Sequence, residues 1–243
     1  MTTATANAEL TTTQRAGLMS GPTYFLIRRL HSLTGIVFGG YLVVHLLINA
    51  TIARGGTEYQ VQVDKIHSLP FLPLIEWTFI YLPILFHTVY GAWIIVTGQP
   101  NVQRYPYEKN IFYVLQRISA VIIVFFMLFH VLSLKYGWLG VNLSFEPHRA
   151  LGTVGRHLDH GFLAWIIYPI GILASCYHLA NGFWAAAITW GLTISAKAQK
   201  RWGYVCAGLF VLTFIAGMIA LIGGANLDYT DMLKTQQEIG HGA

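Results

Sequence analysis

Five long stretches of the chain contain no Asp, Glu, Lys or Arg residue, and they constrain the fold more than any other feature. They cover about residues 32–53, 77–97, 118–134, 160–190 and 203–224. Each is close to or above the ~20 residues that a helix needs to cross the hydrocarbon core of a bilayer. Only 10% of the chain is charged, against about 25% in soluble domains. The sequence therefore predicts five membrane spans.

The predicted fold class is an all-α membrane protein. Backbone groups inside a bilayer must bond to one another, and the five stretches show no strict alternation of apolar and polar residues, so helices are favoured over a barrel. Residues 1–23 are expected to form a flexible tail without a secretory signal, because the first twenty residues hold no apolar stretch. Residues 24–224 are the predicted five-helix transmembrane domain, and residues 225–243 are a second tail.

The distribution of basic residues predicts the orientation of the spans. The N-terminal segment and the 98–117 and 191–202 loops together hold nine Lys and Arg residues and two Glu residues. The opposite side holds six basic and eight acidic residues. Because cytoplasmic loops carry the excess of Lys and Arg, the N-terminus is expected in the cytoplasm of a multi-pass protein of the cytoplasmic (inner) membrane. The net charge of +5 then reflects a basic membrane face and no nucleic-acid partner.

The spans contain an internal repeat built around four histidines. In spans one and three, a histidine follows eleven residues after a hydroxyl residue, as His45 after Thr34 and His130 after Ser119. Spans two and four share the pattern His-x3-Gly-x-Trp, which begins at His87 and at His178. The chain is therefore interpreted as a duplicated two-helix unit followed by a fifth helix.

The rise of ~1.5 Å per helical residue places these histidines in depth. His45 and His130 both lie about 20 Å from the cytoplasmic edge, because spans one and three run outward. Spans two and four run inward, and their shared motif indicates that His87 and His178 face each other nearer the cytoplasm. We call His87 and His178 the inner pair, and His45 and His130 the outer pair.

Two facing imidazoles are the axial ligands of a six-coordinate haem iron, and a four-helix bundle can supply them from opposite sides. The sequence thus predicts a four-helix di-haem bundle plus a fifth helix, with the four histidines as metal ligands. The haems would be non-covalent, since Cys176 and Cys206 lie inside spans and form no CxxCH pattern. A single membrane histidine is more often a hydrogen-bonding residue, so the prediction depends on the paired, repeated arrangement.

Further cofactor contacts are expected around the pairs. Gly91 and Gly182, which follow the inner ligands, would let a flat macrocycle approach the backbone. Arg29, His31 and Arg117 would pair with haem propionates at the cytoplasmic edge. The alternatives are helix-packing glycines and basic residues that only set the topology.

Several short motifs occur in register along the chain. They begin at Arg28 (RRLHSLTG), His45 (HLLIN), Ser68 (SLP), His87 (HTVYG), Leu115 (LQR), His178 (HLANGFW) and Thr189 (TWG). Together they resemble the cytochrome b558 subunit of bacterial succinate dehydrogenase and the related fumarate reductase anchor. The similarity covers about residues 24–222. The resemblance implies five helices, two b haems with the inner and outer ligands assigned above, and flavoprotein and iron–sulfur partner subunits on the cytoplasmic side. Electrons from succinate would reach a membrane quinone, expected to be menaquinone.

One position departs from that resemblance. Some members carry a glutamate two residues before the fourth ligand, implicated in proton transfer, where this chain has Cys176. A carboxylate path for protons is therefore not expected here. Asp64, His67 and Glu76 in the first outer loop are the candidates for quinone contacts, with solvated loop residues as the alternative.

The chain lacks a dinucleotide glycine fingerprint and clusters of iron–sulfur cysteines, so no dehydrogenase site is expected within it. The nearest alternative function is a fumarate reductase anchor that works in the reverse direction. A more remote alternative is a membrane transporter without haem, whose histidines relay protons or bind a transition metal. That alternative predicts inward-facing carboxylates or a broken helix, and the spans show neither clearly.

Overall fold

The computed structural model describes residues 21–98, 102, 107–138, 145–159 and 161–227, and within them every regular element is helical. Five helical segments are long and apolar enough to cross a membrane. They are Gly21–Arg54, Leu72–Thr97, Glu108–Lys135, Trp165–Thr189 and Ala196–Ala225. The prediction of an all-α protein with five spans is thereby confirmed.

Each span begins or ends in a regular α-helix, and several continue into a short distorted segment. The main helices are α2 (Gly21–Ala50), α5 (Leu82–Thr97), α6 (Glu108–His130), α8 (Tyr168–Thr189) and α9 (Ala196–Ala225). The shorter elements are η1 (Thr51–Arg54), α3 (Gly56–His67), α4 (Leu72–Glu76), η2 (Trp77–Tyr81), η3 (Val131–Lys135), η4 (Pro147–Arg149), α7 (Ala150–Leu158) and η5 (Leu163–Ile167).

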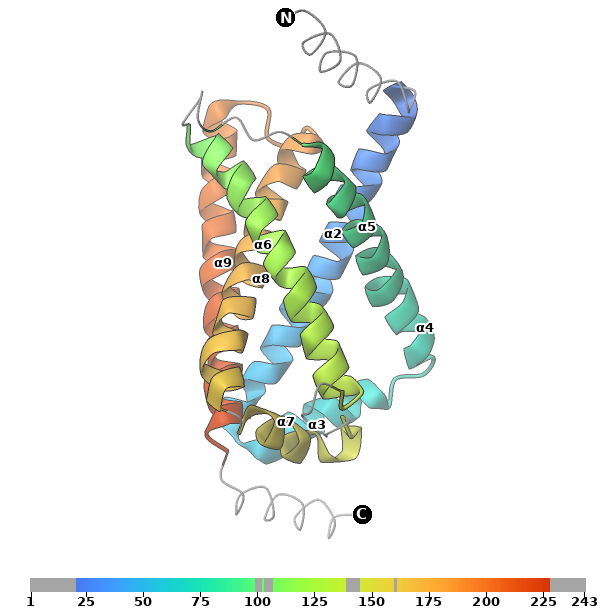
Figure 1. Cartoon of the computed structure of the whole chain (residues 1–243), viewed down its shortest axis with the longest axis vertical. Coiled ribbons are helices and arrows are strands. Elements are labelled where there is room, and N and C mark those ends of the chain that lie inside the picture. The colour runs from blue at the N-terminus through green and yellow to red at the C-terminus, as the bar shows by residue number, and fades with distance from the viewer. Residues whose placement is uncertain (1–20, 99–101, 103–106, 139–144, 160, 228–243) are drawn as a thin grey trace, which may run out of the picture.

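The spans run up and down through one bundle (Figure 1). The start of α2, the end of α5 and the start of α6 lie at one end, which we call the inner end, while α3 and α7 lie together at the other, outer end. Helix α8 packs on α6, α9 and α2, and α2 also packs on α5 and α9. Among the described long helices, α5 packs closely on α2 alone.

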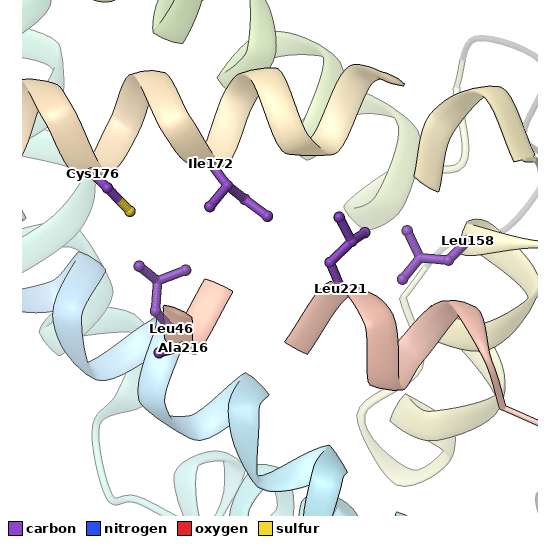
Figure 2. Close-up of a cluster of buried hydrophobic side chains, with 6 residues drawn as sticks. All are labelled: Leu46, Leu158, Ile172, Cys176, Ala216 and Leu221. Carbon is purple, nitrogen blue, oxygen red and sulfur yellow. The ribbon is translucent and has the colours of Figure 1, made fainter. Parts of the chain in front are cut away.

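A cluster of buried apolar side chains fastens α2, α7, α8 and α9 together (Figure 2). Its members are Leu46, Leu158, Ile172, Cys176, Ala216 and Leu221. Burying a Leu or Ile side chain stabilises a soluble fold by about 1.5–3 kcal/mol, but lipid is as apolar as the cluster. Close packing, more than exclusion from water, therefore holds these helices together.

The outer faces of the spans carry large exposed apolar side chains, among them Leu26, Val89, Val96, Phe125 and Leu212. Such a surface would be unstable in water but suits contact with lipid chains. Helices α3 and α7 differ, because they pack on each other at the outer end around Tyr59, Val63, Ala150 and Leu151. These two loop helices were not predicted from the sequence.

Two prolines within the spans stand two residues after the end of a π-helical segment. Pro83 comes after η2 and Pro169 after η5. Proline cannot donate a backbone hydrogen bond and its ring crowds the preceding turn, so a wider turn relieves the clash. Each proline thus explains a local distortion of its span.

The second span begins earlier than the charge-free stretch indicated. Glu76 is the last residue of α4, and the helical segment continues from α4 through η2 into α5. Glu76 therefore belongs to the span and not to the loop where the sequence placed it. Residues 1–20 and 228–243 of the expected tails lie outside the described residues, and the division at 23 and 225 stays a prediction.

Gly171 of α8 makes room for Phe126 of α6, since a methyl group added there would overlap the Phe126 ring. We expect Gly171→Ala to destabilise the protein by about 1–3 kcal/mol, the usual cost of overpacking. The measurement is the midpoint of thermal unfolding in detergent. Gly208→Ala in α9 is the matched control, because nothing lies within 4 Å of its added methyl group. Equal midpoints for the two variants would contradict this account of the α6–α8 contact.

Candidate functional site

The inner pair lies face to face across the bundle. His87 projects from α5 and His178 from α8, and the centroids of their rings are 6.2 Å apart with planes at 83°. Helices α5 and α8 do not otherwise pack closely within the described residues. The structure therefore brings together the two histidines of the repeated His-x3-Gly-x-Trp motif.

The outer pair has nearly the same geometry. His45 of α2 and His130 of α6 have ring centroids 6.1 Å apart and planes at 84°. Again the two helices meet only weakly elsewhere along their described lengths. Both cross-bundle contacts agree with the arrangement expected from the sequence.

Backbone carbonyls hold the inner pair from behind. His87 Nδ1 donates to the carbonyl oxygen of His31 at 3.0 Å, and His178 Nδ1 lies 3.2 Å from that of Gln116. The Ser119 hydroxyl also lies 3.2 Å from His178 Nδ1. A neutral imidazole that donates through Nδ1 keeps an unprotonated Nε2 as a potential ligand atom.

These two carbonyls occupy equivalent positions in the repeat. His31 precedes His45 by 14 residues, and Gln116 precedes His130 by the same number. Each long helix of a repeat unit therefore carries one outer histidine and, about four turns earlier, the carbonyl that supports the inner histidine of its partner helix. The duplication seen in the sequence is thus present in the hydrogen bonds of the site.

Side chains, not carbonyls, contact the outer pair. His130 Nδ1 lies 3.1 Å from the Tyr168 hydroxyl, and His45 Nδ1 lies 3.5 Å from the amide nitrogen of Asn49. The Tyr59 hydroxyl of α3 in turn donates to Asn49 Oδ1 at 3.5 Å. Burial raises the pKa of Tyr59 to about 12, so this hydroxyl stays protonated at neutral pH.

The spacing of both pairs fits two imidazoles on opposite sides of one metal. A bond from a metal to an imidazole nitrogen is about 2 Å long, and a ring with ~1.3 Å bonds has its centroid about 1 Å behind that nitrogen. The centroids of two such rings would be about 6 Å apart, close to the 6.1 and 6.2 Å observed.

A metal that arrives with its own equatorial ligands suits these pairs better than a bare ion. Protein sites for bare ions use three or more side chains. No group of three or more His, Cys, Asp or Glu residues that could hold a metal occurs in the described part of the chain. A porphyrin iron needs only two axial ligands, which is what each pair offers.

His31 is part of the inner cluster. Its ring stacks on that of His87 with centroids 4.0 Å apart and planes at 13°. Gly35, one turn further along α2, makes room for the same ring, because an added methyl carbon would lie 2.6 Å from His87 Cε1. The sequence indicated His31 as a candidate for haem propionates at the cytoplasmic edge, and not as a stacking neighbour of His87.

Five polar atoms on the inner side of the bundle are buried and lack a hydrogen-bond partner among the described residues. Three belong to the residues suggested for propionates, Arg29 Nε, His31 Nδ1 and Arg117 Nε, and the others are Tyr90 Oη and Thr193 Oγ1. The Arg29 guanidinium lies over Phe25 and Trp190, and that of Arg117 lies over Tyr113. Buried donors are nearly always satisfied, so these three fit an anionic or polar group supplied from outside the chain.

The two motif glycines face protein side chains. A methyl carbon added to Gly91 would lie 3.4 Å from His31 Cε1, and one added to Gly182 would lie 3.5 Å from Gln116 Nε2. Their contact with a macrocycle stays a prediction.

The three residues suggested for quinone contacts lie on two elements. Asp64 of α3 accepts from Gln60 at 3.0 Å and lies 3.8 Å from His148 Nδ1, and His67 Nδ1 lies 2.9 Å from the Val63 carbonyl. Glu76 lies at the end of α4. Their role also stays a prediction.

Cys176 is fully buried in the apolar cluster between α8, α2 and α9, and its sulfur points away from α6 (Figure 2). A charged side chain would be costly at this position. The expected absence of a carboxylate proton path stays a prediction.

Fold and site together define a five-helix membrane protein in which two histidine pairs join the halves of a duplicated bundle. Comparison with known proteins identifies the family. Residues 99–217 match the model of the succinate dehydrogenase/fumarate reductase transmembrane subunit. The chain is also 34% identical over 205 residues to the succinate dehydrogenase cytochrome b558 subunit of Bacillus subtilis (strain 168), covering 84% of this chain and 98% of the relative. The chain belongs to the family of succinate dehydrogenase/fumarate reductase transmembrane subunits.

Proposed function

We propose that this chain is the di-haem membrane anchor of a succinate:quinone oxidoreductase. His87 and His178 bind one b haem, and His45 and His130 bind a second. The observation that carries the proposal is the pair of histidine contacts near 6 Å between helices that otherwise stay apart. The cytochrome b558 name of the relative supports it.

A haem with two imidazole ligands supplies one-electron transfer and leaves no open position for a substrate at iron. The protein's own groups orient the imidazoles. The His31 and Gln116 carbonyls direct Nε2 of each inner ligand toward its partner, because they engage Nδ1. Arg29, His31 and Arg117 offer the buried donors that would hold propionates of the inner haem.

The proposed partners are a flavoprotein subunit and an iron–sulfur subunit, bound at the inner end in the cytoplasm. The basic residues of this end support that placement, with Arg28, Arg29, Lys109 and Arg117 in described helices. The chain would carry electrons from the iron–sulfur subunit to quinone, with menaquinone the expected acceptor near the outer pair. Asp64, His67 and Glu76 remain the candidates for its contacts.

The family includes both succinate dehydrogenases and fumarate reductases. The relative is a succinate dehydrogenase subunit, which favours succinate oxidation. Rates of succinate oxidation and fumarate reduction by the purified complex decide between the two directions.

Replacing one histidine at a time tests the ligand assignment. His45→Ala and His130→Ala should each remove the same haem, whereas His87→Ala and His178→Ala should remove the other. Haem content and reduced-minus-oxidised spectra of the purified complex measure both. His148→Ala is the control, because its side chain is 91% exposed in the outer loop. A wild-type complex without b-type bands would refute the proposal, and loss of the same haem from the His45 and the His87 variants would refute the pairing.

Gly35 should be required by the inner pair alone. In Gly35→Ala the new methyl group meets His87, whose ring is fixed by the His31 carbonyl and cannot easily withdraw. We expect a several-fold lower content of the inner haem and an unchanged outer haem in the same spectra. Gly40→Ala on the same helix is the control, since its methyl group meets nothing within 4 Å. Equal haem contents in both variants would contradict this role.

The orientation can be checked with single cysteines and a membrane-impermeant maleimide. His148→Cys should be labelled in cells whose cytoplasmic membrane is accessible from outside, and Lys197→Cys only in inverted vesicles. Cys176 and Cys206 are buried and should give little background. The reverse labelling pattern would place the N-terminus outside and contradict the proposed partner side.

A further inference from the structure

Tyr168 connects the outer ligand His130 to a second buried histidine. Its hydroxyl lies 3.1 Å from His130 Nδ1 and 2.9 Å from His157 Nε2. His157 belongs to α7, and its side chain is 1% exposed. A hydrogen-bonded chain thus runs from α6 through the first residue of α8 to a loop helix at the outer end.

The positions of the protons in this chain follow from ligation. If His130 Nε2 binds a metal, its proton sits on Nδ1, which must donate to the Tyr168 oxygen. The Tyr168 hydroxyl is then free to donate its own proton to His157 Nε2. Both contacts are satisfied by a single orientation of the hydroxyl, and the two bonds polarise each other in the same direction.

Packed rings hold Tyr168 in place. It lies edge-on to Phe126, His130 and His157, with centroid distances of 5.4, 5.8 and 5.7 Å. Phe126 also stacks on His130 at 5.7 Å. The hydroxyl therefore cannot turn away from His130 without repacking the end of α6.

Among the described residues, the other three ligands are supported differently. His87 and His178 contact backbone carbonyls, with the Ser119 hydroxyl also beside His178, and His45 has a longer contact with the Asn49 amide, which Tyr59 contacts in turn. His130 alone of the four is supported by a side chain that is itself hydrogen-bonded to a buried histidine. The hydrogen bonding of His130 thus extends to α7.

We propose that Tyr168 and His157 are positioning residues for the outer haem, which fix the Nδ1–H tautomer of His130 and make its imidazole a stronger donor to iron. This inference rests on the proposed function. A hydrogen bond to the outer nitrogen raises the basicity of a ligating imidazole, and a more basic ligand favours the ferric state. The hydrogen bonds from His130 through Tyr168 to His157 therefore lower the midpoint potential of the outer haem and leave that of the inner haem unaffected.

The test is a redox titration of the whole purified complex followed by haem absorbance, with the low-spin ferric EPR signal as a second readout. Tyr168→Phe should raise the potential of the haem that His45 and His130 variants lose, and shift its EPR signal. His157→Leu should raise that potential by a smaller amount, because Tyr168 remains but loses its acceptor. His157→Gln, whose amide oxygen can accept from Tyr168, should return it close to the wild-type value.

Tyr204→Phe is the matched control, because it makes the same change at a tyrosine that is 66% exposed on α9. Its potentials should both stay near wild type. If Tyr168→Phe loses the outer haem, the His157 variants carry the test. An unchanged potential of the outer haem, or equal shifts in His157→Leu and His157→Gln, would overturn this inference. The proposed function would still hold in that case, provided that the complex binds two haems. A wild-type complex without haem would instead refute the proposed function.

Discussion

The direction of each imidazole is the constraint on which the site depends. A neutral histidine has one nitrogen that donates and one that accepts, so whatever engages Nδ1 decides where Nε2 can act. At His87 and His178 the engaging groups are carbonyls of neighbouring helices, and at His130 the engaging group is a tyrosine hydroxyl. The positions of the helices and the directions of the rings are thereby set together. Within each pair the two rings face each other, and the distance between their centroids is nearly the same in both pairs.

The fold and the pairing could be read from the sequence because both follow from simple periodic physics. A span must be about 20 residues long and nearly free of charge, and the rise of a helix converts residue spacing into depth. The internal repeat indicated which histidines face each other, since His87 and His178 share a motif. The 14-residue relation of His31 to His45 and of Gln116 to His130 was also present in the printed chain, but only the hydrogen bonds give it a meaning.

Other features depend on contacts between segments that no short-range pattern encodes. His157 lies between two spans and belongs to none of the sequence motifs, yet α7 packs against the bundle and buries it beside Tyr168. The stacking of His31 on His87 requires the cross-helix space that Gly35 leaves. Glu76 was assigned to a loop because the apolar stretch was counted from charge to charge, whereas a helix in the interfacial region can include a charged residue at its end.

The limited packing of α5 has a consequence for how this bundle tolerates loss of a ligand. A helix that touches several neighbours keeps its place when one contact is removed. Helix α5 packs closely on α2 alone among the described long helices, and it reaches α8 mainly through His87. Apart from α2 and the facing histidines, a hydrogen bond from α6 also reaches α5, since Arg117 Nη2 donates to the Ile94 carbonyl at 3.5 Å. The conformational order of α5 is therefore a reporter of the inner site from within the fold itself.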